Sequence, residues 1–411
     1  MTTPHDRHVV RGLAQRVADL AALPVMAERR RRWTDHNALR GDRRPLVLCF
    51  PEGCWPELVS PAALVCTDPT LRAFEHQLRH TLYTAEVLRD DQPVEPVFNV
   101  NWSVHCSDYG VAIPHHRGDN RGSYTWDPPL VDLDADFARL RPRTFAVDRD
   151  ATARKLAAAQ DVLGDILTVR IRSWLWWSCG LTQTLAFLVG IEQAMLAMID
   201  QPAALHRLMA FLRDDMAAYA DWAQREGLLT AGNANDYVGS GGLAYSDELP
   251  TPVDTARNAD RWGFAESQET VGISPTMFEE FVMPYQRPLL ERFALNCYGC
   301  CEELEHRIDV VLREVPRLRR VSVSPKANQA ALADKLAGRY VFSRKADPVP
   351  VCVEFDEAQI RRDIRHTLDV AAGQPLEIIL KDTHTVRHEP HRLSRWVELA
   401  REEIAARFGP Q

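Results

Sequence analysis

Residues 319–345 read RRVSVSPKANQAALADKLAGRYVFSRK, and this stretch decides the fold. Arg320–Val323 is a short apolar run suited to a strand, 329–336 is typical of a helix, and Tyr340–Phe342 predicts the next strand. A strand, a helix and a second strand in so few residues form a unit whose strands lie parallel. The stretch therefore favours an α/β fold built from repeated units of this kind.

The same alternation continues outward in both directions along the chain. Further strands are expected at 97–104, 166–171, 228–231, 263–266, 294–297 and 376–380, and helices at 185–199, 203–226, 275–290, 302–315, 357–370 and 390–408. Eight strand-then-helix units in series predict a (β/α)8 TIM barrel. A doubly wound sheet is the main rival, but no G-x-G-x-x-G motif follows a strand and no Walker loop is present.

The first 90 residues form a separate part of the prediction. Helices at 11–40 and 67–88 and a short strand at 45–49 indicate an N-terminal helical extension (1–90) packed on the barrel (91–411). This extension is expected to cap the barrel or to form a homodimer contact. Its run Arg29–Arg32 is either a polyanion site or a solvated helix face, and the sequence leaves both interpretations open.

Composition narrows the classes of function. The chain has 411 residues, with 49 Lys+Arg against 57 Asp+Glu, and its net charge of −8 disfavours general nucleic-acid binding. The polar start shows no signal-peptide core, and the nine cysteines are an odd number, which together predict a reducing cytoplasmic location. The uncharged stretch 173–191 contains glycines and polar residues, so no membrane span is expected.

Reactive side chains gather where the predicted strands end. In a barrel these ends meet on one rim. Gathering many polar groups there costs desolvation free energy, which a fold without a functional site has no reason to bear. The pattern therefore indicates an enzyme with a small-molecule substrate. The candidate catalytic residues are Glu266, Gln268, Tyr298, Arg344, Lys345, Asp382 and His384. The candidate substrate-binding residues are Asn99, Asn101, His105, Asn233, Asp236, Ser324 and Lys381.

Three of the nine cysteines crowd into one strand end. Cys297, Cys300 and Cys301, followed by Glu302, offer soft and hard ligands, and His384 is the best-placed partner from another loop. Zinc needs four ligands, or three plus solvent in a catalytic site. A metal site or catalytic thiol, plain buried thiols and a redox pair are the open interpretations.

A pair of glutamates suggests acid–base chemistry. Glu266 and Glu269 follow the strand predicted at 263–266, three residues apart. If both enter one pocket, their repulsion raises one pKa and leaves a general acid beside a base.

Several of these stretches resemble the uroporphyrinogen decarboxylase-like superfamily. The similar stretches are Trp262–Glu269, Ile273–Pro275, Phe281–Tyr285, Leu295–Glu302, Arg319–Pro325, Phe342–Lys345 and Lys381–Thr385. The similarity spans roughly residues 90–405 and looks closest to a branch related to cobalamin-dependent (corrinoid) methyltransferases. It implies a (β/α)8 barrel with a funnel-shaped pocket at the carboxyl ends of the strands.

The resemblance implies an activity and its cofactors. The methyltransferases of the superfamily hold zinc through His-x-Cys and a later Cys. Here the corresponding ligands would be two of Cys297, Cys300 and Cys301, with His384 and Glu302. The resemblance thus suggests a corrinoid/thiol-type methyltransferase using zinc and cobalamin delivered by a partner protein.

Two other functions stay open. One is a metal-free decarboxylase or lyase acting on a small carboxylated substrate through Glu266, Arg344 and His384. The other is a non-catalytic partner of a corrinoid protein. Arg344, Lys345 and Lys381 are expected to make the pocket locally positive.

Overall fold

The central element of the fold is a parallel sheet of six strands in the order β1-β14-β13-β12-β11-β10. The computed structural model describes residues 3–117, 124–172, 174–250 and 255–410. The strands are β1 (Leu46–Cys49), β10 (Trp262–Ala265), β11 (Leu295–Tyr298), β12 (Leu318–Val323), β13 (Val341–Lys345) and β14 (Leu376–Leu380). Because neighbours from β10 to β14 are also consecutive in the chain, helical crossovers join them, and the expected α/β class is confirmed.

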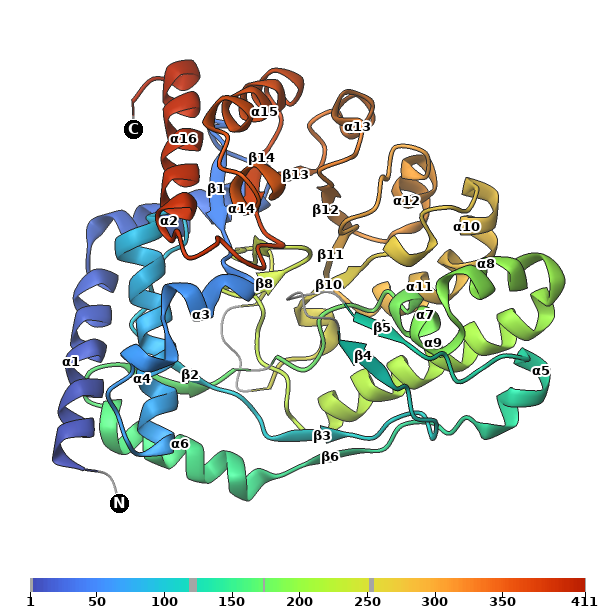
Figure 1. Cartoon of the computed structure of the whole chain (residues 1–411), viewed down its shortest axis with the longest axis horizontal. Coiled ribbons are helices and arrows are strands. Elements are labelled where there is room, and N and C mark those ends of the chain that lie inside the picture. Colours follow the sequence, from blue (N-terminus) through green and yellow to red (C-terminus); the bar gives the residue numbers. More distant parts are fainter. Residues whose placement is uncertain (1–2, 118–123, 173, 251–254, 411) are drawn as a thin grey trace.

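Helices of the second half of the chain lie on the outer side of this sheet (Figure 1). They are α10 (Pro275–Phe281), α11 (Met283–Leu290), α12 (Ile308–Glu314), α13 (Gln329–Leu336), α14 (Val349–Cys352), α15 (Glu357–Val370) and α16 (His391–Phe408). Side chains cap two of the predicted starts, because Ser274 accepts from the amide of Met277 and Asn328 from that of Ala331. All five residues of β14 are buried, as expected for a strand covered on both faces.

The first half of the chain forms smaller sheets beside the central one. β2 (Val97–Val100) and β7 (Thr168–Ile171) pair in parallel, and three antiparallel ribbons complete the set. The ribbons are β3 (Val104–Cys106) with β6 (Phe145–Val147), β4 (His115–Arg117) with β5 (Tyr124–Trp126), and β8 (Tyr237–Val238) with β9 (Gly242–Leu243). Among the described residues the ladders thus form a six-stranded sheet and a separate β2–β7 pair, rather than one closed ring of eight strands.

The strand expected at 228–231 does not form. Leu228 and Leu229 are buried, so their apolar character was interpreted correctly. The Leu228 amide bonds to the carbonyl of Ala223 at the end of helix α9 (Pro202–Arg225), and its carbonyl accepts from Trp102 Nε1. These backbone groups are therefore already paired without a neighbouring strand.

The N-terminal segment carries helices and one strand of the central sheet. Its helices are α1 (Pro4–Ala21), α2 (Pro24–Asn37), α3 (Trp55–Leu58) and α4 (Pro69–Tyr83), and α6 (Arg149–Leu163) packs beside them. Val10, Leu78, Phe98 and Leu163 belong to the second apolar core that these helices share. The segment also supplies β1, which lies at the edge of the sheet beside β14.

The remaining helices lie among the strands of the first half. Helix α5 (Leu133–Asp136) lies between β5 and β6, and α7 (Thr182–Val189), α8 (Ile191–Asp200) and α9 lie between β7 and β8. Among the described residues, no single helix is long and apolar enough to cross a membrane, and α7 with α8 passes that test only as a pair bent by 93°.

One face of the sheet carries a buried ionic group. The register places Ser343 opposite both Ser322 and Glu377, so the three side chains share a face. Arg320 Nε lies 3.0 Å from Glu377 Oε1, and His36 Nε2 from α2 lies 3.2 Å from Glu377 Oε2. Burial alone would raise the pKa of Glu377, but Arg320 and His36 hold it well below its usual value.

Candidate functional site

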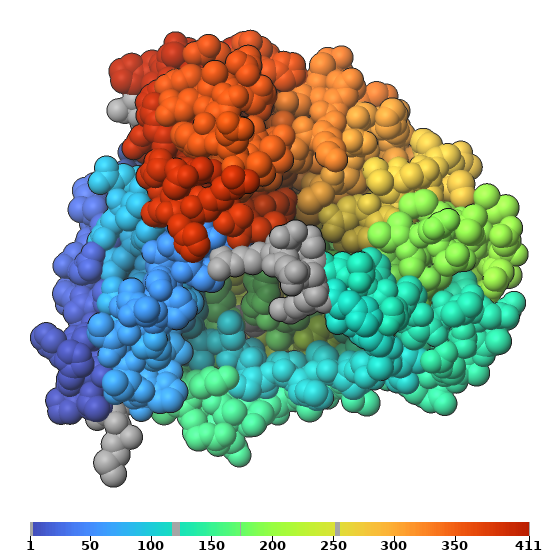
Figure 2. Space-filling view, viewed as in Figure 1, coloured from blue at the N-terminus to red at the C-terminus, as the bar shows by residue number. Residues whose placement is uncertain are grey.

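A cavity of about 710 Å³ opens where β1, β11 and β14 end (Figure 2). Phe50 follows β1, Cys300 follows β11 by two residues, and Lys381 follows β14. Parallel strands bring their carboxyl ends to one edge of a sheet, so residues distant in sequence meet here. The lining side chains that carry chemistry include the thiols of Cys49, Cys300 and Cys301, the charged groups of Glu52, Glu95, Lys381 and Asp382, and the amides of Gln77, Gln92, Asn99, Gln183, Asn235 and Gln268.

Cys300 is the best-supported nucleophile of the cavity wall. Its Sγ lies 3.5 Å from Cys301 Sγ and 3.2 Å from Ser240 Oγ, which donates to it. Lys381 Nζ lies 3.9 Å away on the same side. The hydrogen bond from Cys301 lowers the pKa of Cys300 below that of an ordinary thiol, and the Lys381 charge acts in the same direction against burial.

The adjacent Cys301 holds the proton of this pair. The hydrogen bond that it shares with Cys300 raises the pKa of Cys301 above the usual value. Cys301 is exposed at the cavity, and its Sγ lies 3.6 Å from Asp382 Oδ2. The two thiols are thus unequal, and Cys300 is the more acidic of the pair.

Lys381 links the thiol pair to the carboxylates. Its Nζ donates to Asp382 Oδ1 at 2.7 Å, and the Asp382 amide donates to Glu52 Oε2 at 2.8 Å. Burial alone would lower the pKa of Lys381, but Cys300 and Asp382 raise it above its usual value. The ammonium therefore stays charged across the physiological range.

The glycine-rich loop 239–242 explains how Ser240 reaches Cys300. Gly239 has a φ of +63°, and a Cβ there would lie 2.9 Å from the Cys297 Cβ. A Cβ on Gly242 would lie 2.3 Å from Arg320 Cζ. Only glycine has no Cβ, so these two glycines allow the loop backbone to lie in contact with the side chains of β11 and β12.

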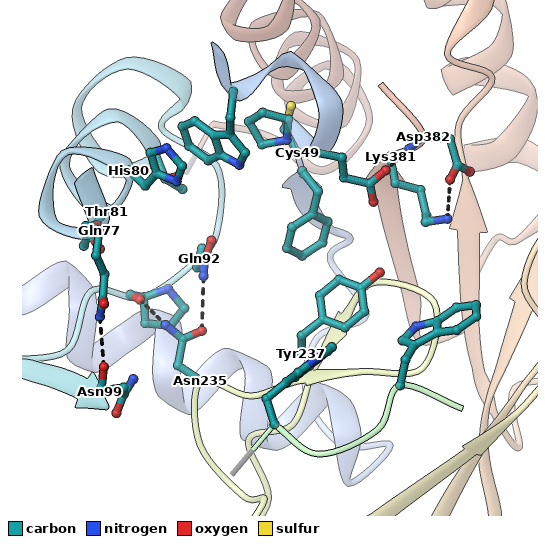
Figure 3. Close-up of a pocket in the computed structure, with 18 of the residues that line it drawn as sticks. Cys49, Gln77, His80, Thr81, Gln92, Asn99, Asn235, Tyr237, Lys381 and Asp382 are labelled. Carbon is teal, nitrogen blue, oxygen red and sulfur yellow. Dashed lines mark hydrogen bonds and ion pairs between the residues drawn. The ribbon is translucent and has the colours of Figure 1, made fainter. Parts of the chain in front are cut away.

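The opposite end of the cavity is rich in amides (Figure 3). Gln77 Nε2 donates to the Asn99 carbonyl at 3.3 Å, and Gln92 Nε2 donates to Asn235 Oδ1 at 3.4 Å. Lys381 and Asp382 lie across the cavity from this group, with Tyr237 between the two ends. The cavity can thus hold a substrate that has a reacting end and a separate polar end.

Aromatic rings form much of the remaining wall. Trp55 stacks on His80 with ring centroids 3.7 Å apart, and Phe50 meets Tyr237 edge-on at 5.1 Å. Burial lowers the pKa of His80 to about 4, so this imidazole is neutral at pH 7. Trp174 and Trp177 are the other tryptophans that line the cavity. Such walls suit apolar or flat groups of a substrate.

The structure brings six of the predicted site residues to this cavity. These are Asn99, Gln268, Cys300, Cys301, Lys381 and Asp382. Gln268 bonds through Nε2 to Glu269 Oε1 at 3.1 Å. Sequence analysis identified these residues because each lies at or after the end of a strand, and the carboxyl ends of parallel strands meet at one edge of a sheet.

Three predicted residues lie behind the wall. Glu302 accepts from the amides of Ser267 at 3.0 Å and Cys300 at 2.7 Å, so it fixes the backbone that carries the thiolate. Tyr298 is buried and donates to Gln286 Oε1 at 2.7 Å. Glu266 is also buried, and burial and then Glu269 raise its pKa, which agrees with the repulsion expected for this glutamate pair.

Arg344 and Lys345 do not line the cavity, which corrects the expectation of a locally positive pocket. Successive residues of a strand face opposite sides, so the two cannot both point inward. Arg344 turns to the helix side and donates to the Ser324 carbonyl, while the Ser324 side chain is fully buried. Lys345 lies on the inner face and donates to Ser343 Oγ at 2.5 Å.

The remaining predicted polar residues lie outside the cavity. Asn101 and His105 are exposed, and His105 lines a separate open groove along β3 and β6. Asn233 donates to the Pro250 carbonyl at 2.6 Å, and Asp236 pairs with Arg172 at 2.5 Å. His384 is exposed and packs on Gly53 instead of facing Cys300.

The predicted zinc ligands are not assembled into one site. Cys297 is buried beside Arg320, whose Nη1 lies 3.6 Å from its Sγ, and the Glu302 oxygens bind backbone amides. Within the described ranges, no three His, Cys, Asp or Glu side chains are grouped to hold a metal. A cation at Cys300 would also meet the Lys381 ammonium, so these residues do not fit zinc.

Sequence reasoning missed the contribution of the N-terminal segment. Glu52 comes three residues after the strand predicted at 45–49, so the same search for polar residues after strand ends could have found it. Gln77, His80, Thr81 and Thr84 follow one another at helical spacing on one face of α4 and its last turn. That face was assigned to an extension outside the pocket, and no local pattern shows where it docks.

Comparisons with known proteins bear on the fold. The sequence matches no family model and no curated protein. A methyltransferase from Methanosarcina mazei has a similar structure, with a TM-score of 0.51 over 91% of this chain and 98% of that chain. The two sequences are 12% identical, so the likeness concerns the fold alone.

Proposed function

We propose that this protein is a methyltransferase that moves a methyl group from a methylated corrinoid, carried by a partner protein, to a thiol substrate. The observation that carries the proposal is the Cys300 thiol, whose pKa is lowered, beside Lys381 at the carboxyl ends of the strands. The fold shared with a solved methyltransferase supports it. We further propose that the sheet belongs to a (β/α)8 barrel of the uroporphyrinogen decarboxylase-like type.

Cys300 acts as the base that activates the substrate thiol. The substrate S–H transfers its proton to Cys300 Sγ, and the resulting substrate thiolate attacks the methyl carbon. The carbon–cobalt bond breaks with its electron pair remaining on cobalt, and a thioether leaves the cavity. Because its pKa is lowered, a larger fraction of Cys300 is ionised at neutral pH than of an ordinary thiol, and a thiolate can accept a proton from a substrate thiol.

Lys381 and Glu302 support this step from two sides. The Lys381 charge stabilises the negative sulfur before the proton arrives. Glu302 fixes the Cys300 amide, and therefore the position of Sγ, through its 2.7 Å hydrogen bond. No step requires a metal held by the protein.

The charges of the cavity favour methyl transfer over the decarboxylase alternative. Lys381 is the single Lys or Arg among the described residues that line it, and it is already paired with Asp382. A carboxylated substrate would lie near Glu52, Glu95 and Asp382. A neutral or cationic substrate avoids this repulsion.

The activity test uses methylcobalamin with a panel of small thiols. We expect the purified protein to accelerate loss of the methyl–cobalt absorbance with matching formation of a thioether. Demethylation no faster than in buffer with every thiol would contradict the proposal. Carbon dioxide released from small carboxylated substrates would instead favour the decarboxylase alternative.

A further inference from the structure

A second cavity, of about 420 Å³, lies at the amino ends of β1 and β14. Leu46 begins β1, Pro375 precedes β14, and both line it. Helix α2, the loop 38–45 and the end of α16 complete its wall. Because the strands are parallel, this cavity and the thiol cavity lie at opposite ends of the sheet.

Guanidinium groups dominate the lining of this second cavity. Arg31, Arg32, Arg40, Arg43 and Arg44 line it, against the carboxylates of Glu28, Asp35 and Asp42. The spacing of 28, 31, 32 and 35 places the α2 members on one face of the helix. A positive excess concentrated in one concave site of a chain with net charge −8 is suited to an anion.

Most of these arginines already have partners. Arg40 pairs with Asp247 at 2.6 Å, Arg44 donates to the Gly409 carbonyl at 2.8 Å, and Arg32 Nη1 lies 3.8 Å from Asp91. Such contacts hold the guanidinium groups in place around the cavity without filling it. The arrangement is therefore formed before any ligand arrives.

Arg43 carries an unpaired donor. Its Nη1, like the Nη1 of Arg32, is buried and has no hydrogen-bond partner among the described residues. Its φ of +60° lies in the left-handed region, which a residue other than glycine adopts at some cost. A buried donor without a partner is expensive, so this side chain indicates a missing acceptor.

We propose that this cavity binds a compact anion with at least two negative charges, of the diphosphate class, through Arg40, Arg43 and Arg32. Phosphate oxygens accept forked hydrogen bonds from guanidinium groups, and Arg43 Nη1 gains the acceptor that it lacks. A cavity of about 420 Å³ suits a small ligand rather than a nucleic-acid chain. His36 also lines the cavity, and its hydrogen bond to Glu377 places the ligand next to the buried ionic group.

Calorimetry on the full chain tests the proposal, with pyrophosphate, inorganic phosphate and ADP as separate titrants. We expect saturable one-to-one binding of pyrophosphate that is tighter than that of phosphate. ADP that binds more tightly than pyrophosphate would identify the ligand as a nucleoside diphosphate. ADP that binds more weakly would identify the ligand as a free diphosphate. Both results support an anion site in this cavity.

Variants locate the binding. Arg43→Asn keeps a residue that tolerates a positive φ and should weaken pyrophosphate binding by about tenfold or more. Arg16→Gln, on exposed α1, removes one positive charge elsewhere and should leave binding unchanged. Thermal unfolding confirms that each variant folds. The proposal would be overturned by the absence of saturable pyrophosphate binding at millimolar concentration. It would also be overturned if Arg43→Asn and Arg40→Gln both bound pyrophosphate as tightly as the parent protein.

Discussion

Lys381 Nζ lies 3.9 Å from Cys300 Sγ, at the point where the ends of β14 and β11 meet in the cavity wall. The two residues are far apart in the chain, and the parallel sheet alone brings them together. The Lys381 charge helps to lower the pKa of Cys300, and the Cys300 sulfur raises the pKa of Lys381.

Replacing Lys381 by methionine should raise the pKa of Cys300. The neutral side chain cannot stabilise the thiolate, so the thiolate fraction at pH 7 falls, by roughly tenfold for one pKa unit. The measurement is the rate of iodoacetamide labelling at Cys300 across pH, followed by peptide mass spectrometry. Cys179 is the internal control, because burial raises its pKa to about 12. Identical pH profiles for the two proteins would contradict the pairing.

Gly180→Ala should destabilise the wall behind the thiolate. A Cβ at this position would lie 2.3 Å from Glu266 Oε1 and 2.6 Å from the Glu266 carbonyl, so the backbone must move. We expect a loss of about 1–3 kcal/mol in unfolding free energy, measured with urea. Gly12→Ala in α1 is the matched control, since nothing lies near its Cβ and alanine favours the helix. A Gly180→Ala protein as stable as its parent would show that this packing is loose.

Glu377→Gln should break the buried ionic group of the sheet. Removing one partner leaves Arg320 buried with a neutral neighbour, at an expected cost of about 3–5 kcal/mol. Glu398→Gln, in an exposed pair with Arg395, should change stability by less than about 1 kcal/mol. If the two substitutions lowered the unfolding free energy equally, the buried ion pair would contribute no more to stability than the exposed one.

The Glu377 carboxylate also makes the stability of the protein depend on pH. The pKa of Glu377 is lower in the folded protein than in the unfolded chain, so the unfolded chain binds the proton first. Its contribution is present above about pH 4.3, the unfolded value, and is lost as the pH falls through the folded pKa. Urea unfolding from pH 7 to pH 3 should therefore show a steeper acid loss for the parent than for Glu377→Gln.

Lys345→Met should stabilise the protein most at low pH. Burial lowers the pKa of Lys345 to about 7, whereas an unfolded lysine titrates near ~10.4. Between these values only the unfolded chain binds the proton, so the stability of the parent rises with pH. The gain from methionine should shrink from pH 6 to pH 10, as measured by urea unfolding. The exposed Lys326→Met is the control, and parallel curves for Lys345→Met and the parent would refute the pKa assignment.

The sequence predicted most regular elements of the second half of the chain. β14, α13 and α15 begin and end where expected, because each has a clear apolar period and polar flanks. The alternation within β13 could also have shown that Arg344 and Lys345 face opposite sides. What it could not show is which side is inward, since β12 and β13 are buried on both faces for most of their length.

The sequence was less informative about the walls of the cavity. Asn99, Cys300 and Lys381 follow from strand ends, but Trp55 and His80 depend on where α3 and α4 dock. Docking is decided by the second apolar core around Leu78 and Phe98, which joins segments distant in the chain. No local period records such a contact, so the aromatic wall appears only in the structure.

The direct test of the thiolate base is methylcobalamin demethylation by Cys300→Ser, with the parent and Cys179→Ser measured in parallel. Serine keeps the size of the side chain but is not a base at neutral pH, so the rate should fall by about 10²-fold or more. Cys179→Ser should retain the rate of the parent, because Cys179 lies outside the cavity. A Cys300→Ser protein that demethylates methylcobalamin as fast as the parent would contradict the proposed mechanism.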